Sequence, residues 1–201
     1  DNPLDVWDSY MKQFGLGVTT GSGLPGESAG DPYYYKTAET SSRQAALVFA
    51  SFGQQGRYTA LQLAQYATML ANRGKRLKPQ FVLKITDYEG NVLEEFNEPI
   101  ILNEVDIPDA YWDAVINGME SGVSWAFDGF PHTFRRKTGT SESDVAGRRV
   151  ENAVFIAFAP AENPKLAVAV VVPEGGFGAW GAAPIARKIF DAYDQKIGLA
   201  N

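Results

Sequence analysis

Four consecutive residues, Lys137-Thr138-Gly139-Thr140, carry the strongest chemical signal in the sequence. Lysine supplies a cation for a developing anion or a substrate carboxylate. Two threonines that are two positions apart on a strand project to the same side, so both hydroxyls can bond one carboxylate. Glycine lets a ligand lie against the backbone, where an N–H can point at an oxyanion. The alternative interpretation is a strand end with ordinary turn residues.

Other chemically capable residues give weaker signals. Ser9 and Lys12 have SxxK spacing, but the pattern favours an exposed helix face. His132 is the only candidate base for a Ser-His-Asp triad, and a structural or exposed histidine is the better interpretation. Residues 21–26 fit GxGxxG, but no strand is expected before them, so a dinucleotide site is not predicted.

Charged and aromatic residues gather on either side of the four-residue motif. Glu142 and Asp144 lie among the cations, which favours a solvated hairpin over steering of an anionic substrate. Trp125, Phe127 and Phe130 are candidates for a substrate groove, with core packing as an equal alternative. The five cations are Arg135, Arg136, Lys137, Arg148 and Arg149.

Composition narrows the function classes. The 201 residues include 24 acidic and 18 basic side chains, giving a net charge of −6, which argues against a nucleic-acid partner. The absence of cysteine excludes disulfides and thiolate metal sites, and one histidine leaves no zinc cluster, so we expect no metal and no cofactor. No apolar run is long enough to predict a membrane segment.

The elements expected before the motif are mostly helical. Apolar spacing predicts a helix over residues 3–14, followed by a glycine-rich loop at 15–30. A short helix or loop covers residues 38–52. Thr59 and Gln62 then form the capping box of a further helix.

An antiparallel sheet is expected around the motif. Strand candidates at 151–159 and 165–172 are almost continuously apolar, which is typical of a pair buried on both faces. The fold class is therefore α+β, an antiparallel sheet covered by helices. The other expected elements are a hairpin at 80–96, a helix capped by Asp109 and running to about Glu120, an aromatic loop at 121–131, a strand at 133–138, and a final helix at 182–197.

Four stretches together resemble the transpeptidase domain of the penicillin-binding proteins, most closely the monofunctional class B enzymes. They are KTGTSES, FGLGVTTGSGLPGESAG, SFGQQGRYTALQLAQYATMLANRGKRLKP and GAWGAAPIARKIFDAYD. The resemblance implies the fold shared with the serine β-lactamases. It also implies a serine acyl transfer in which an SxxK serine attacks D-Ala-D-Ala stem peptides and cross-links peptidoglycan. β-Lactams acylate the same serine.

The resemblance also implies roles for the motif residues. Lys137 would hold the cationic corner of the site, and Thr138 and Thr140 would bind the substrate carboxylate. Gly139 would belong to the same substrate-binding strand. The N–H of Thr140 would form half of an oxyanion hole. Lys137 and Thr140 are thus the expected catalytic residues.

Four departures qualify the resemblance. SxN is absent from the sequence, and the one SxxK, at Ser9, lies in a helix directly before the glycine-rich loop. We therefore expect residues 1–201 to be the C-terminal portion of a single transpeptidase domain. SxxK and SxN would lie in an N-terminal portion, on the same or a separate chain, and this chain alone would be inactive. Arg136 replaces a usually small residue, and Ala60 replaces a frequent proline.

The expected partners are a peptidoglycan stem peptide, β-lactam antibiotics and that N-terminal portion, at an extracytoplasmic, membrane-anchored location whose anchor lies outside this chain. A serine β-lactamase is one alternative, although LPGE and TALQLA fit it poorly. A β-lactam-sensing or catalytically inactive domain is another. An intact upstream SxxK and SxN together with rapid deacylation would favour the β-lactamase. Natural absence of both motifs from the full protein would favour an inactive domain.

Overall fold

A computed structural model describes residues 2–119 and 125–200 and shows helices combined with antiparallel strands, which confirms the predicted α+β class. The helices are α1 (Pro3–Gln13), α2 (Tyr34–Thr40), α3 (Arg43–Ser51), α4 (Ala60–Ala71), α5 (Asp109–Gly118), the 3₁₀ turn η1 (Trp125–Phe127), α6 (Gly178–Gly181) and α7 (Ala183–Lys196). The strands are β1 (Lys75–Leu77), β2 (Lys84–Thr86), β3 (Val92–Glu95), β4 (Ile101–Glu104), β5 (Arg135–Val145), β6 (Arg148–Ala159) and β7 (Leu166–Val172).

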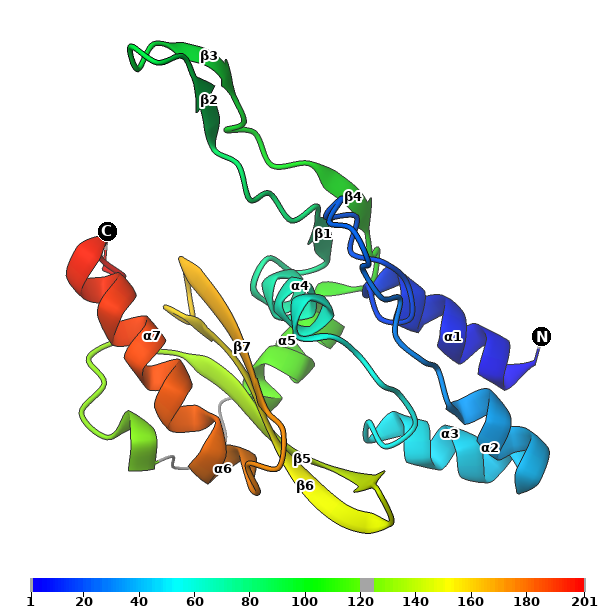
Figure 1. Cartoon of the computed structure of the whole chain (residues 1–201). Coiled ribbons are helices and arrows are strands. Elements are labelled where there is room, and N and C mark those ends of the chain that lie inside the picture. The colour runs from blue at the N-terminus through cyan, green and yellow to red at the C-terminus, as the bar shows by residue number, and fades with distance from the viewer. Residues whose placement is uncertain (1, 120–124, 201) are drawn as a thin grey trace.

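The largest sheet has three antiparallel strands in the order β5-β6-β7 (Figure 1). The two apolar strands predicted to pair do so, from Ala153 opposite Val172 to Ala159 opposite Leu166. β5 and β6 are longer than the strands predicted at 133–138 and 151–159. They continue as a two-stranded ribbon to a tight turn at Ala146 and Gly147, both of which have positive φ.

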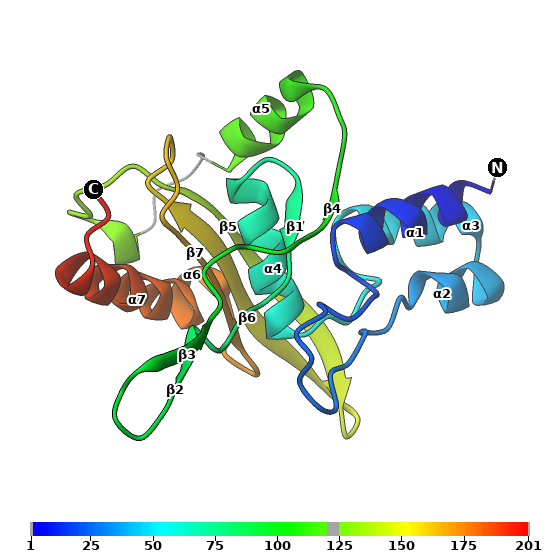
Figure 2. The same cartoon turned by 90° about the horizontal axis from the view of Figure 1, so that it is seen from above.

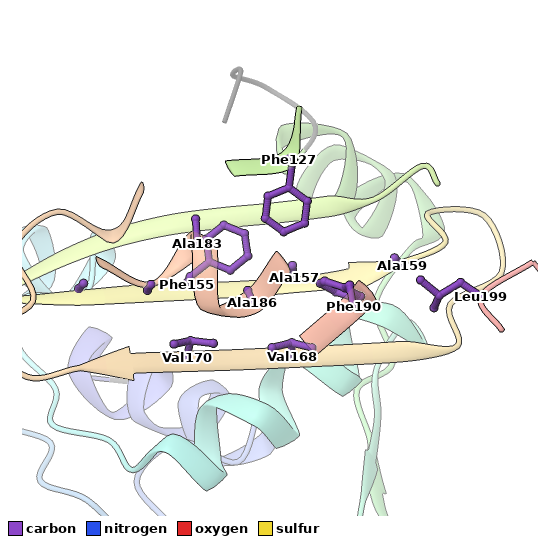
Figure 3. Close-up of a cluster of buried hydrophobic side chains, with 12 residues drawn as sticks. Phe127, Phe155, Ala157, Ala159, Val168, Val170, Ala183, Ala186, Phe190 and Leu199 are labelled. Carbon is purple, nitrogen blue, oxygen red and sulfur yellow. The ribbon is translucent and has the colours of Figure 1, made fainter. Parts of the chain in front are cut away.

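One face of this sheet packs against α7 and η1. Phe155 of β6 is fully buried there, and its ring stacks on that of Phe127 with centroids 5.6 Å apart. Figure 3 shows this cluster between the strands and α7. Its buried members are Phe127, Ala153, Phe155, Ala157, Ala159, Val168, Val170, Ala182, Ala183, Ala186, Phe190 and Leu199.

The opposite face packs against α4 and α5. Phe158 of β6 joins Met69 and Leu70 of α4 and Trp112 and Ile116 of α5 in a second buried cluster. Cover on both faces explains why residues 153–159 of β6 and the strand β7 are unbroken apolar runs, since both faces of the sheet pack against other elements there.

Helices α1, α2 and α3 form a smaller group, away from α7 (Figure 2). Its core contains Leu4, Tyr34, Ala46 and Ala50, and the Tyr34 hydroxyl donates to Asp8 at 2.6 Å. The expected short helix or loop at 38–52 is wrong in part. α2 begins earlier, at Tyr34, and a break at Ser41 and Ser42 separates it from α3, which the Ser42 side chain caps.

The sequence predicted the N-terminal caps of α4 and α5, and the structure confirms one of them. Thr59 and Gln62 form the complete capping box at α4, as predicted. The predicted cap of α5 is wrong, because Pro108 is the N-cap and Asp109 is the first helical residue, its carboxylate in the first turn. The predicted end near Glu120 lies outside the described residues.

The predicted hairpin at 80–96 is present as β2 and β3, which pair beyond a second short pair, β1 and β4. The hairpin extends away from the rest of the chain as an arm (Figure 1). Its apolar side chains are exposed, including Leu83, Leu93 and Tyr88 at the turn. The two strands therefore pair although most of their side chains are exposed.

Candidate active site

The Lys137–Thr140 segment lies on β5, an edge strand of the three-stranded sheet as far as the described residues extend. Thr138 is opposite Phe155 and Thr140 is opposite Ala153. Directly opposite residues of an antiparallel pair share a face. The two threonines therefore lie on the face that α7 covers, and both remain partly accessible. The register thus places two hydroxyl-bearing side chains side by side at the sheet edge.

Lys137 and its neighbour Arg136 have opposite environments. Lys137 is exposed, and its Nζ donates to the carbonyl of Thr138 at 2.6 Å. Arg136 is only 8% exposed, and burial lowers the pKa of its guanidinium. Successive residues of a strand face opposite ways. Arg136 therefore lies on the α7 side of the sheet, opposite Ala157, and Lys137 lies on the other side. The arginine at this position therefore adds a buried charge on the face that also carries Thr138 and Thr140.

The short helix α6 rests on the backbone of the motif strand. A Cβ built on Gly178 would lie 2.4 Å from the carbonyl oxygen of Gly139 and 2.4 Å from that of Val154. Only glycine permits this approach. Sequence reasoning missed this role of Gly178. The signal was a glycine-rich stretch directly after a buried strand.

The glycine-rich loop at 15–30 is fixed by side-chain hydrogen bonds. Glu27 accepts from the Thr20 backbone N–H at 2.6 Å, from the Thr20 hydroxyl, and from the Ser22 hydroxyl at 2.8 Å. Desolvation acts to raise the pKa of the Glu27 carboxyl, but the hydrogen bonds from Thr20 and Ser22 outweigh it and hold the pKa below its usual value.

Two buried glutamines of α4 complete this anchoring. Gln62 Nε2 donates to the carbonyls of Val18 and Ala29, at 2.7 and 2.9 Å. Gln65 Nε2 donates to those of Thr20 and Leu77, at 3.0 and 2.7 Å. The capping-box prediction identified Gln62, but its contacts with the loop were not predicted. The segment at 21–26 follows a helix and is part of this anchored loop, so it lacks the strand that a dinucleotide site requires.

The other candidate nucleophile and base have structural contacts. The Ser9 hydroxyl donates to the Val6 carbonyl at 2.8 Å, and Lys12 pairs with Asp8 at 2.6 Å, on an exposed part of α1. His132 Nε2 lies 2.7 Å from Asp194 Oδ2, linking the segment before β5 to the end of α7. The contact with His132 lowers the pKa of the Asp194 carboxyl. These contacts favour the structural interpretation of each residue.

The basic and aromatic candidates divide between different roles. Arg148 pairs with Glu174 at 2.5 Å and Arg149 pairs with Glu142, both exposed at the far end of the ribbon, which favours the solvated hairpin. The aromatic residues are also divided. Phe127 is buried in the core and Phe130 packs against it, whereas Trp125 is 47% exposed.

Among residues 2–119 and 125–200, no group of three or more acidic or histidine side chains is placed to hold a metal ion. Within the same ranges, no helix has the length and apolar character needed to cross a bilayer.

Comparison with solved structures defines the class of fold. Penicillin-binding protein 2B from Streptococcus pneumoniae strain R6 superposes with a TM-score of 0.77 at 33% identity, over 94% of this chain and 32% of that chain. The imipenem acyl-enzyme complex of penicillin-binding protein A from Mycobacterium tuberculosis gives 0.76 at 27% identity, over 94% and 41%. The fold is that of penicillin-binding protein transpeptidase domains.

The family model described as "Penicillin binding protein transpeptidase domain" matches residues 1–191, and the chain belongs to this family. Penicillin-binding protein 2A of Bacillus subtilis is 35% identical over 85% of the chain and 25% of that protein. The peptidoglycan D,D-transpeptidase MrdA of Haemophilus influenzae is 32% identical over 94% and 33%. The chain therefore spans a quarter to a third of the length of these relatives.

Proposed function

We propose that the chain forms the KTGT-bearing portion of a serine D,D-transpeptidase that cross-links peptidoglycan stem peptides and is acylated by β-lactams. One observation carries the proposal: the motif lies on an accessible edge strand that is held from behind by a packed core. The named activity of MrdA and the acyl-enzyme title of the mycobacterial structure support the reaction class. The working location is extracytoplasmic, at the membrane-anchored cell-wall synthesis machinery.

In this proposal, each motif residue has one task. Lys137 supplies the cation beside the reacting carbonyl. Its ammonium is exposed and donates to a backbone carbonyl, so a substrate can recruit it. Thr138 and Thr140 bind the terminal carboxylate of the stem peptide with their hydroxyls. The N–H of Thr140 stabilises the oxyanion. Gly139 leaves room for the substrate along the strand.

The acylated serine lies outside this chain in the proposal. The only SxxK sequence, at Ser9, has both its hydroxyl and its lysine bound to other groups of α1. A serine without an adjacent base is too weak a nucleophile for acyl transfer. The working site is therefore composite, with SxxK and SxN supplied by an N-terminal portion of the same domain. We expect this chain alone to be inactive.

The first test is the reaction of the complete domain with a fluorescent penicillin. Lys137→Ala should lower the acylation rate 100-fold or more, a barrier increase of at least about 2.7 kcal/mol, with little change in melting temperature because the side chain is exposed. Lys165→Ala, another exposed lysine beside the same sheet, should leave the rate unchanged. A large stability loss with unchanged acylation would show a structural role. Label on any serine of this chain would overturn the composite site.

The second test removes one hydroxyl at a time. Thr138→Val or Thr140→Val keeps the β-branch and should cost about 1.5–3 kcal/mol, roughly 10- to 150-fold in acylation efficiency, because a hydrogen bond to a charged group is lost. A substrate analogue without the carboxylate should lose little more in either variant. Equal penalties for both ligands would refute the carboxylate assignment.

A further inference from the structure

Two tryptophans lie together on the surface beside the motif strand. The rings of Trp125 and Trp180 have centroids 5.1 Å apart and planes tilted by 33°. Trp180 is 66% exposed and Trp125 is 47% exposed, whereas Trp112 is buried in the core. Two neighbouring indoles left open to water are an unusual surface feature, and exposed aromatic clusters commonly mark a binding site.

Both rings are held in place by the elements that carry them. Trp180 belongs to α6, which Gly178 seats on the backbone of Gly139. Trp125 belongs to η1, and Arg187 of α7 secures the segment that follows. Arg187 Nη1 donates to the carbonyl of Asp128 at 3.1 Å, and its guanidinium lies 5.1 Å from the centroid of the Phe130 ring. The tryptophan pair is thus anchored relative to the motif strand.

The position of the pair fits the architecture of a stem-peptide substrate. Trp180 is two residues beyond Gly178, so its Cα lies within roughly 12 Å of Gly139 at 3.8 Å per Cα step. A stem peptide of about five residues spans at most ~17 Å when extended. The opposite end of that peptide is joined to a sugar of the glycan strand. Trp180 therefore lies no farther from the motif strand than one extended stem peptide can span from a carboxylate end bound at Thr138 and Thr140.

The chemistry of the rings also suits a sugar. The face of an indole is electron-rich, and it attracts groups that carry partial positive charge. One face of a pyranose ring presents a set of C–H groups of that kind, while its hydroxyls point outward to water. An open indole face therefore binds a sugar ring without a buried charge.

We propose that Trp125 and Trp180 form a platform that binds the glycan portion of the peptidoglycan substrate while its stem peptide occupies the motif strand. This inference rests on the proposed transpeptidase function and adds a second substrate contact to it. The two tryptophans increase affinity for the glycan-linked substrate over the free peptide. They take no part in the acyl transfer itself.

The test compares two substrates in the complete domain: a disaccharide-linked stem pentapeptide and the same pentapeptide with an acetylated N-terminus. The ratio of their kcat/KM values for D-alanine release isolates the sugar contribution, because a general loss of activity cancels. We expect the parent protein to favour the disaccharide-linked substrate. Trp180→Ala and Trp125→Ala should each lower that ratio about tenfold, and Trp180→Phe should retain part of it. Tyr88→Ala, which removes a fully exposed aromatic ring on the distant arm, should leave the ratio unchanged.

An unchanged ratio in both tryptophan variants would overturn the platform while leaving the transpeptidase function intact. A self-association that Trp180→Ala abolishes, with the ratio unchanged, would identify the pair as a contact between protein copies and would also overturn it. If the parent protein released D-alanine from neither substrate and was not acylated by penicillin, the proposed transpeptidase function would be refuted. The platform proposal, which rests on that function, would be refuted with it.

Discussion

The sheet that carries the motif and the loop at 15–30 are held by different forces. β6 is buried on both faces by apolar clusters, with Phe155 facing α7 and Phe158 facing α4 and α5. The loop is held by polar side chains, since Glu27, Gln62 and Gln65 bond its backbone and hydroxyl groups. An edge strand that must stay accessible obtains rigidity from the core behind it. An irregular loop has unpaired backbone groups, which hydrogen bonds must satisfy.

The comparison predicts that the largest single loss of stability comes from the sheet core. Phe155→Ala should lower the free energy of unfolding of the complete domain by about 3–5 kcal/mol, because it removes a fully buried ring and leaves a cavity. Denaturant titration measures the change. Phe81→Ala, on the exposed arm, is the matched control and should stay within about 0.5 kcal/mol. Equal losses in the two variants would contradict the two-sided core.

A smaller loss is expected where the loop meets α4. Gln62→Leu keeps the volume of a fully buried side chain but leaves the carbonyls of Val18 and Ala29 without a donor. Unsatisfied buried groups should cost about 2–3 kcal/mol here. Hydrogen exchange should increase across residues 15–30 and stay unchanged in β6. Gln54→Leu, at an exposed position, is the control. A gain in stability from Gln62→Leu would show that apolar packing also governs this region.

The smallest expected effect is a pH dependence of stability that arises from Glu27 in the loop at 15–30. The pKa of the folded Glu27 carboxyl lies below the unfolded value of about 4.3, so the carboxylate contributes stability that is fully present above that value. This contribution is lost as the pH falls through the folded pKa. Glu27→Gln should lower the melting temperature slightly at pH 7, and the difference from the parent should shrink below pH 4. A difference that is constant from pH 7 to pH 3 would refute the role of the charge.

Local sequence chemistry accounts for several features on its own. Thr59 and Gln62 specify the start of α4, since a capping box forms between residues three apart whatever surrounds it. The apolar runs of β6 and β7 predicted a pair with cover on both faces. The break between α2 and α3 was missed, although residues 39–44 are all polar and Ser42 is a residue type favoured at helix N-caps. The cap of α5 was misplaced by one residue, since Pro108 and Asp109 are both common at helix starts.

For the candidate site, the sequence by itself determined the residue types of the motif and the strand that carries them. Alternation along a strand also fixed the shared side of Thr138 and Thr140, because it is a property of the backbone. Tertiary structure decided the rest. It placed Gly178 on Gly139 and Trp180 beside Trp125, pairs that are far apart in the sequence. Such contacts depend on how α6, η1 and the sheet pack together, and no local pattern records that packing.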